Sequence, residues 1–329
     1  MDAVNGHANG HGQRPGEELL ARLTYSALKA VPTDVLTRIR EHVEGVIDVR
    51  ERQYDLFQPA AAAADPVAPA EASGPVKHEL AAVLSPSQVR TWLTCQTRWW
   101  YRYGLGLSEP KTAALAIGSA VHAAIGENFR QKIESKRDLP QTGVVAVFRD
   151  AWRAAAGETQ FQTGEDPDEL GAMGEALTVK YMDEAAPFVE PAAVELPVRG
   201  AIAGVAVQGV VDLLDVDGRI VDLKTSAKSP AGIDGHYRRQ VATYTQLAPG
   251  ATGAARIDTL TKTRTLKLVS QSFTVNGADL MDATVMYPLA QEGMRSGLYT
   301  PNRSSYLCSR KHCPHWRRCE AEYGGEVSE

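Results

Sequence analysis

The sequence contains few cysteines and no long apolar run. Its 329 residues include only four cysteines, and aromatic residues make up 7% of the chain. No stretch approaches the roughly 20 consecutive apolar residues that a membrane-spanning helix needs. The opening MDAVNGHANGHG lacks the charged and then apolar order of a signal peptide. We therefore expect a cytoplasmic protein that makes no contact with a membrane.

An excess of basic charge is also missing. Lys and Arg number 35 against 40 Asp and Glu, which gives a formal charge of −5. This balance excludes a protein that holds nucleic acid by bulk charge, so any such contact must come from local basic patches. Hydrophobic residues make up 43% of the chain, which supports one large folded domain or two smaller ones and excludes wholesale disorder.

Three of the four cysteines lie close together near the end of the chain. They are Cys308, Cys313 and Cys319, and the fourth, Cys95, lies far upstream. In a cytosolic chain, such grouping favours a metal centre over disulfides. Four thiolates are the number that a 4Fe–4S cluster requires. Zinc would accept the same four ligands or recruit a nearby histidine, so the spacing leaves both metals open.

Composition divides the chain into four parts. Residues 1–16 are rich in Gly, Asn and His and predict a disordered tail. Residues 17–58 carry apolar side chains at spacings of three and four, which predicts a helical arm for partner docking or self-association. Residues 59–76 are mostly Ala and Pro and predict an extended linker. The main domain is expected over residues 77–329.

Within the main domain, helical patterns come first and strand patterns follow. The segment Ser85-Pro86-Ser87-Gln88 is typical of a helix start, and one helix is expected from there to about Tyr103, with Cys95 inside it. The further helices are expected over 115–133, 144–155, 168–188, 237–247 and 278–295, and the strands over 194–199, 202–215, 219–223, 257–263 and 267–274. This order indicates an α/β or α+β domain.

Two of these strands carry a set of acidic and basic residues around the Asp-Gly pair at 217–218, which signals a hairpin. A two-residue loop would put Asp212 and Asp222 on opposite faces of the sheet. A three-residue loop over 216–218 would set them directly across from one another, with Cβ atoms roughly 5 Å apart. Lys224 would project from the same face. Two carboxylates that share a divalent cation, with an ammonium beside them, suffice to hydrolyse a phosphodiester, so this chemistry requires the three-residue loop.

Several motifs in order make residues 80–322 resemble the PD-(D/E)XK nuclease superfamily, in particular the RecB-like and AddB nuclease domains and the CRISPR-associated Cas-four-type iron–sulfur exonucleases. The matching segments are LSPSQ through CQTRWWYRY from Leu84 to Tyr103, GSAVH from Gly118 to His122, GVVD from Gly209 to Asp212, VDLKTS from Val221 to Ser226, and QVATY from Gln240 to Tyr244. Two features depart from the family pattern. Asp222 stands where Glu is commoner, and four residues instead of two separate the first two C-terminal cysteines.

The resemblance implies a restriction-endonuclease-like α/β core, with a small mixed sheet flanked by helices. It implies a metal-dependent deoxyribonuclease, most simply an exonuclease on single strands or duplex ends, in DNA repair or recombination in a bacterial or phage-infected cell. His122, Asp212, Asp222 and the backbone carbonyl of Leu223 would bind Mg²⁺ or Mn²⁺. Lys224 would act with the two aspartates in catalysis.

The same resemblance implies that Cys95, Cys308, Cys313 and Cys319 bind a 4Fe–4S cluster that fixes the C-terminal segment to the first helix.

DNA contacts are expected in two places. The predicted substrate-binding residues are Gln240 and Tyr244, four apart on one helix face, and the basic residues Arg310, Lys311, Arg317 and Arg318, whose segment between 302 and 319 contains no acidic residue.

Two alternatives remain open at this point. The first is a non-catalytic DNA-binding or scaffolding protein that keeps a nuclease fold, and the second is a nuclease stapled by zinc. The chain contains no G-x-x-x-x-G-K-[ST] motif, so the sequence predicts no helicase motor.

Overall fold

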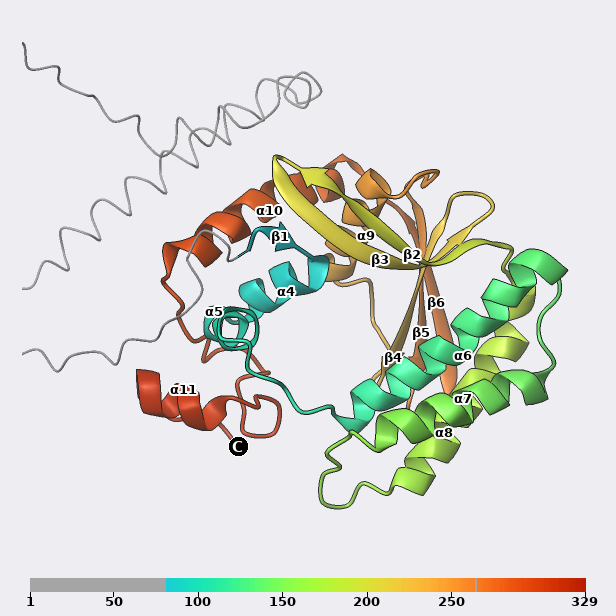
Figure 1. The fold of residues 1–329 in the computed structure, drawn as a ribbon, viewed down its shortest axis with the longest axis horizontal. Helices are drawn as coiled ribbons and strands as arrows, with labels where there is room; N and C mark the ends of the chain where they lie inside the picture. The colour runs from blue at the N-terminus through green and yellow to red at the C-terminus, as the bar shows by residue number, and fades with distance from the viewer. Residues whose placement is uncertain (1–80, 264) are drawn as a thin grey trace, which may run out of the picture. The chain divides into compact units, whose positions relative to one another are not determined.

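The computed structural model describes residues 81–263 and 265–329. The predicted tail (1–16), helical arm (17–58) and linker (59–76) lie outside these residues. One six-stranded mixed sheet runs through the centre (Figure 1). Its strands are β1 (Val83–Leu84), β2 (Pro191–Ile202), β3 (Val205–Asp215), β4 (Ile220–Ser226), β5 (Ala254–Thr261) and β6 (Lys267–Thr274).

The strand order is β1-β3-β4-β5-β6, and β2 also pairs with β3. The pairs β2–β3, β3–β4 and β5–β6 are antiparallel, whereas β1–β3 and β4–β5 are parallel. The crossover between β4 and β5 passes through α9 (Gly235–Leu247). Because a parallel pair needs such a crossover, this helix has to cover the sheet beside β4.

Helices cover both faces of the sheet (Figure 1). Helices α6 (Ala113–Ser135), α7 (Gln141–Ala156) and α8 (Pro167–Glu184) pack on one face. On the other face lie α9, α10 (Gly277–Ser296) and α4 (Pro86–Thr94). The remaining helical segments are α5 (Gln96–Trp99), η1 (Trp100–Gly104), η2 (Ala186–Phe188) and α11 (Trp316–Tyr323). None of the described helices is both long and apolar enough to cross a membrane.

Strand β4 shows why two helical layers form. Val221 and Leu223 pack against α6 and α8, whereas Ile220 packs with Val241 of α9 on the opposite face. Successive side chains of a strand point to opposite faces, so a strand buried on both sides is apolar at almost every position. Asp222 is the acidic exception in this run, with an exposed fraction of 2%. The predicted α/β restriction-endonuclease-like fold is confirmed.

The prediction of a single helix from 85 to 103 is wrong at Cys95. The helix starts as expected, since the Ser85 side chain accepts a hydrogen bond from the Gln88 N–H. At Cys95, however, the backbone is extended, with φ −163° and ψ 112°, and separates α4 from α5. The break lets Trp92 and Trp99 bury their indoles edge to face, 5.5 Å between ring centroids. The patterns also did not predict β1 and α11.

Candidate active site and cysteine pocket

The hairpin between β3 and β4 adopts the register that the chemistry required. Leu213 pairs with Val221, which is the register of the three-residue loop that ends at Gly218. This glycine has a φ of 74°, in the left-handed region that such a loop demands. One position further along, the same register sets Asp212 across from Asp222.

The side chains expected to do chemistry meet where β3 and β4 part. The Lys224 Nζ atom lies 2.6 Å from Asp222 Oδ2 and 3.9 Å from Asp212 Oδ2. His122 Nδ1 lies 3.7 Å from Asp212 Oδ2. The Leu223 N–H donates a 3.1 Å hydrogen bond to the same oxygen. The structure thus brings together the five residues that the sequence proposed for the catalytic and metal site.

Helix α6 carries His122 to the sheet because it approaches β4 closely at Gly118. A Cβ atom at Gly118 would lie 3.1 Å from Thr225 Oγ1, closer than most side-chain carbons come to a neighbour. A glycine one turn before the histidine therefore lets the helix lie against the strand. This gives a packing reason for the G-x-x-x-H spacing.

Burial and crowded charge govern the electrostatics of the pair. Burial raises the pKa of Asp222, the Lys224 ammonium opposes that rise, and the Asp212 carboxylate adds to it. Burial lowers the pKa of Lys224, but Asp222 and Asp212 outweigh it, and the pKa ends above its ordinary value. Lys224 therefore keeps its charge at neutral pH, where it faces two carboxylates.

The donor set suits a hard divalent cation. Asp222 Oδ2 is buried and makes no hydrogen bond, since its close contact with Lys224 lacks the angle of one. Carboxylate oxygens are the ligands that Mg²⁺ and Mn²⁺ prefer, and an imidazole is compatible with Mn²⁺. In residues 81–263 and 265–329, no three His, Cys, Asp or Glu side chains are grouped tightly enough to hold one ion. In this arrangement, Lys224 supplies the positive charge beside the two carboxylates.

Gln240 and Tyr244 of α9 lie beside the Asp222 carboxylate. The Gln240 amide donates to Asp222 Oδ1 at 3.2 Å and to the Tyr244 hydroxyl at 3.4 Å. Tyr244 is only 6% exposed. A Cβ atom at Gly209 would lie 2.6 Å from the Tyr244 ring, so the glycine of the GVVD motif is what allows the ring to pack there. The sequence analysis assigned both residues to substrate binding, and in the structure they contact Asp222 and each other.

The close approach at Gly209 leads to a prediction. In Gly209→Ala, the methyl group displaces the Tyr244 ring, and with it Gln240, at a stability cost of about 1–3 kcal/mol. We expect kcat to fall about tenfold because Asp222 loses its fixed orientation. Gly143→Ala on α7 is the matched control, since a Cβ atom there meets nothing within 4 Å. Equal rates for the two variants in a nuclease assay would contradict this positioning role.

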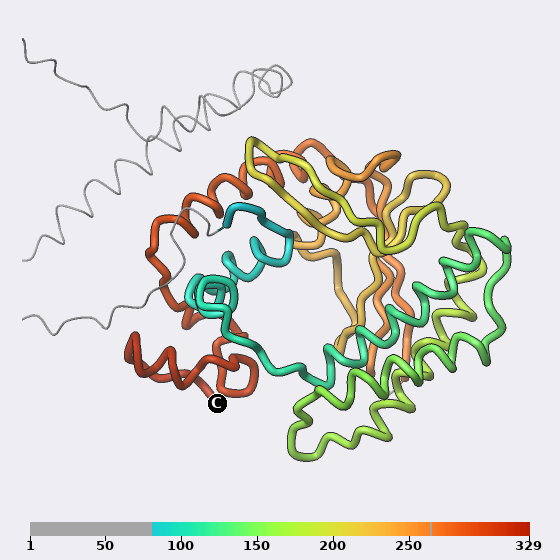
Figure 2. Tube along the Cα trace, in the orientation of Figure 1, coloured from blue at the N-terminus to red at the C-terminus, as the bar shows by residue number. Residues whose placement is uncertain are grey.

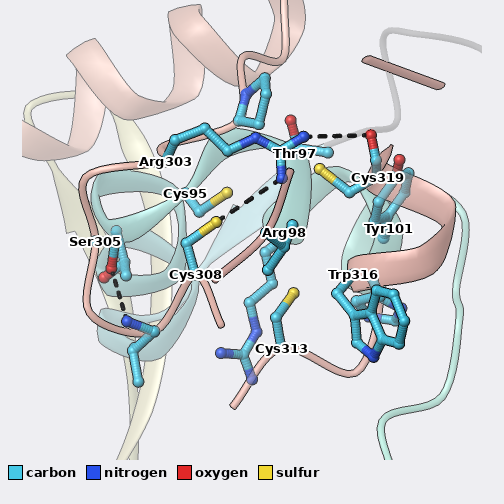
Figure 3. A pocket seen from close by; sticks show the side chains of 15 residues that line it. Cys95, Thr97, Arg98, Tyr101, Arg303, Ser305, Cys308, Cys313, Trp316 and Cys319 are labelled. Carbon is cyan, nitrogen blue, oxygen red and sulfur yellow. Dashed lines mark hydrogen bonds between the residues drawn. The ribbon is translucent and has the colours of Figure 1, made fainter. Parts of the chain in front are cut away.

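The four cysteines line one cavity at the far end of α4 (Figure 3). Cys95 comes from the break between α4 and α5, and Cys319 from α11. Cys308 and Cys313 lie in the loop before α11, and all four thiols are free. Residues separated by more than two hundred positions are thus brought together, as the cysteine count suggested. We call this cavity the cysteine pocket.

Basic side chains border the cysteine pocket. Arg303 contacts Cys308 Sγ at 4.0 Å and donates to the Gly324 carbonyl at 2.7 Å. Burial raises the pKa of Cys319 to about 11, although Arg303 opposes the shift. Burial also raises the pKa of Cys313. Thiols in such a site ionise when a metal takes the place of the protons.

Glu109 contacts two residues that line the cysteine pocket, Arg98 and His315, and no pattern in the sequence pointed to it. It accepts two hydrogen bonds from Arg98, at 2.8 and 2.9 Å, and one from Arg102 at 3.1 Å. His315 Nε2 lies 3.4 Å away. Burial raises the pKa of Glu109, but these three partners outweigh it and hold the pKa well below its usual range. The residue lies in the extended segment 105–112, which runs from η1 to α6 (Figure 2).

Two arginines of the basic strip expected between 302 and 319 are paired with acidic residues. Arg310 pairs with Glu329 at 2.9 Å, and Arg318 pairs with Glu322. Acidic residues that follow the strip in sequence thus turn back onto it. Within the described residues, two of the four predicted DNA contacts make no ion pair, namely Lys311 and Arg317.

Two solved structures resemble this fold. One is of a protein from Eubacterium rectale named provisionally as an exonuclease, with 16% identity and a TM-score of 0.49 over 70% of this chain and 89% of that chain. The other, of SSO0001, has 12% identity and a TM-score of 0.36 over 73% and 87% of the two chains. At these TM-scores neither likeness bears on activity. Among curated proteins, none matches the sequence.

One family profile, described as the PD-(D/E)XK nuclease superfamily, matches residues 83–320. The matched span is more than half of the chain, and it contains His122, the two hairpin aspartates, Lys224 and all four cysteines. The mixed sheet with helices on both faces agrees with that match. The chain belongs to the PD-(D/E)XK nuclease superfamily, a superfamily of phosphodiester hydrolases.

Proposed function

We propose that the chain is a Mg²⁺- or Mn²⁺-dependent deoxyribonuclease that digests single strands or duplex ends. The observation that carries this proposal is the contact of the Lys224 ammonium with two carboxylates, Asp212 and Asp222, beside His122. A fold retained only to bind DNA would have no use for an aspartate that is 2% exposed on an otherwise apolar stretch of β4, because burying a charge costs free energy even beside an ammonium. The non-catalytic scaffold is therefore the weaker alternative.

The residues divide the chemistry between them. His122, Asp212, Asp222 and the Leu223 carbonyl would hold the ion, which when bound supplies a water of lowered pKa and offsets charge on the phosphoryl oxygens. Lys224 is within reach to orient the attacking water or to stabilise the charge that develops on the phosphate. Gln240 keeps the Asp222 carboxylate in place through its 3.2 Å hydrogen bond.

The test is a digestion assay on DNA labelled at either end, single-stranded and duplex, with Mn²⁺, Mg²⁺ or EDTA present. We expect the chain to shorten the strands with either metal ion and to leave them intact in EDTA. A circular single strand added in parallel separates exonuclease from endonuclease activity. Intact substrates in every metal-containing reaction would favour the scaffold instead.

We further propose that the cysteine pocket holds a 4Fe–4S cluster. A 4Fe–4S cluster binds each of its four thiolates through a different iron atom, so it suits four thiols spread around one cavity. A single zinc ion instead needs its ligands about 2.3 Å from one centre. Metal analysis of anaerobically purified protein distinguishes iron from zinc.

A further inference from the structure

A cluster of side chains beside Lys224 has no part in the chemistry described so far. Tyr237 lies in the first turn of α9, and two cations approach its ring. Lys224 Nζ is 5.5 Å from the ring centroid, and the guanidinium carbon of Arg90 is 5.8 Å from it. The His236 ring lies beside the tyrosine, 3.9 Å between centroids. One aromatic ring thus links the catalytic lysine to an arginine on α4.

Arg90 differs from the two neighbouring arginines of α9. Arg238 and Arg239 of α9 each form a two-bond ion pair with an aspartate of α10, at distances of 2.6 to 3.1 Å. Arg90 is exposed and makes no ion pair within residues 81–263 and 265–329. The fold therefore uses the arginines of α9 as structural ties and leaves the charge of Arg90 available beside the active site.

His236 adds to the case for a ligand at this position. Its Nε2 atom is buried and has no hydrogen-bond partner. Burial lowers the pKa of His236 to about 4, and the neighbouring charge of Arg90 contributes to the shift. The imidazole is therefore neutral at physiological pH, so Arg90 and Lys224 are the cations that face the Tyr237 ring.

A free guanidinium and a partly exposed aromatic ring are the two groups that proteins use to hold single-stranded nucleic acid. Arginine binds phosphate oxygens through paired N–H donors, and aromatic rings stack on bases regardless of sequence. The Tyr237 ring centroid lies 5.5 Å from Lys224 Nζ and 5.8 Å from the Arg90 guanidinium carbon, so the ring stands between the lysine and the arginine's charge.

We propose that Arg90 and Tyr237 form a substrate subsite for the nucleotide next to the scissile phosphate, with Arg90 on its phosphate and Tyr237 against its base. This inference rests on the proposed nuclease function. It predicts that the nuclease prefers strands whose bases are unpaired next to the scissile phosphate. Arg90 belongs to α4, the helix that ends at Cys95. The cysteine pocket therefore fixes the position of one side of this subsite.

The experiment compares steady-state cleavage of a fluorescent single-stranded oligothymidylate by the full chain and by Arg90→Ala. We expect KM to rise about tenfold with kcat changed less than twofold, because the subsite binds substrate and does no chemistry. The slope of log affinity against log salt should become shallower by about 0.7, the contribution of one phosphate contact to a single strand. Arg90→Lys should recover part of the loss, and Tyr237→Phe should behave like the unaltered chain.

The matched control is Arg153→Ala on α7, an exposed arginine that pairs only with Asp150 three residues before it. It removes the same charge at a distance from the active site. If Arg90→Ala and Arg153→Ala have the same KM and the same salt slope, the subsite is wrong and the nuclease function stands. If the unaltered chain does not cleave the oligonucleotide with Mn²⁺ or Mg²⁺, the proposed function fails, and the subsite falls with it.

Discussion

Asp222→Asn protein is expected to fold normally and to lose at least a thousandfold in cleavage rate. Asparagine has the shape of aspartate, and its Oδ1 atom can still accept the hydrogen bond from Gln240. What disappears is the negative charge that balances Lys224 and that a divalent cation would need as a ligand. A thousandfold loss corresponds to about 4 kcal/mol of transition-state stabilisation.

Stability should change little in this variant. The Asp222 carboxylate is 2% exposed, so its charge is costly to bury even beside an ammonium. Removing one partner of a buried ion pair usually costs about 3–5 kcal/mol because the other charge is left alone, but here Asp212 still lies 3.9 Å from Lys224, and the cost of burying the Asp222 charge disappears as well. We expect the thermal midpoint to stay within a few degrees of that of the unaltered chain. The loss of activity would then be chemical and not a consequence of unfolding.

Asp217→Asn provides the matched control. It makes the same chemical change in the same hairpin, at an exposed loop position. Its cleavage rate should remain within twofold of the unaltered chain. Metal-dependent cleavage that persists in Asp222→Asn above a tenth of the original rate would show that the active site lies elsewhere.

The hairpin that carries Asp212 and Asp222 could be predicted because its constraints are local. Only one loop length puts Asp212 and Asp222 on the same face, and Gly218 supplies the backbone conformation that this loop needs. Alternation along β4 then places Lys224 beside Asp222 without any knowledge of the rest of the fold. His122 was reached through the resemblance alone, because its distance from Asp212 depends on how α6 packs.

The features that escaped prediction depend on distant partners. Glu109 has no local pattern, and its function appears only when Arg98 and His315 converge on it. The pairing of Arg310 with Glu329 likewise requires the chain to turn back after the last cysteine. The break at Cys95 lies between Trp92 and Trp99, whose indoles pack edge to face in a contact that a helical pattern does not specify. Tertiary contacts override local propensity at such positions.

The second large effect that we expect is a loss of stability when the proposed cluster is removed. In α11, Cys319 is the only buried residue, so this helix gains little from apolar burial. Apart from the rings of Tyr299 and His315, which pack on Trp100 and Tyr101, the C-terminal segment contacts the first helices through scattered polar bonds, such as Tyr101 to Glu322 at 2.6 Å and Asn302 to the Thr94 carbonyl at 3.0 Å. Contacts of this kind contribute about 1 kcal/mol each. Metal–thiolate bonds are therefore expected to hold the segment in place.

Cys319→Ser tests this expectation directly. Breaking the link between the C-terminal segment and Cys95 opens a loop of more than two hundred residues, and closing a long loop of this kind is worth about 4–5 kcal/mol. For a domain of this size, such a loss lowers the thermal midpoint by roughly 10–20 °C. We expect the variant to lose iron and to be cleaved by proteases after α10, while the sheet and its helices stay protected.

His312→Ala is the control, because His312 is exposed in the same loop but is a ligand only in the zinc alternative. It should keep its iron and its thermal midpoint. A colourless anaerobic preparation with one zinc and no iron would establish the zinc staple. A Cys319→Ser protein with unchanged metal content and melting would rule out both metals as the staple.

Since Arg90 lies on the helix that ends at Cys95, the loss of the cluster should also raise KM for a single strand. Measured on the folded fraction below the first melting transition, that rise would link the cysteine pocket to substrate binding as well as to stability.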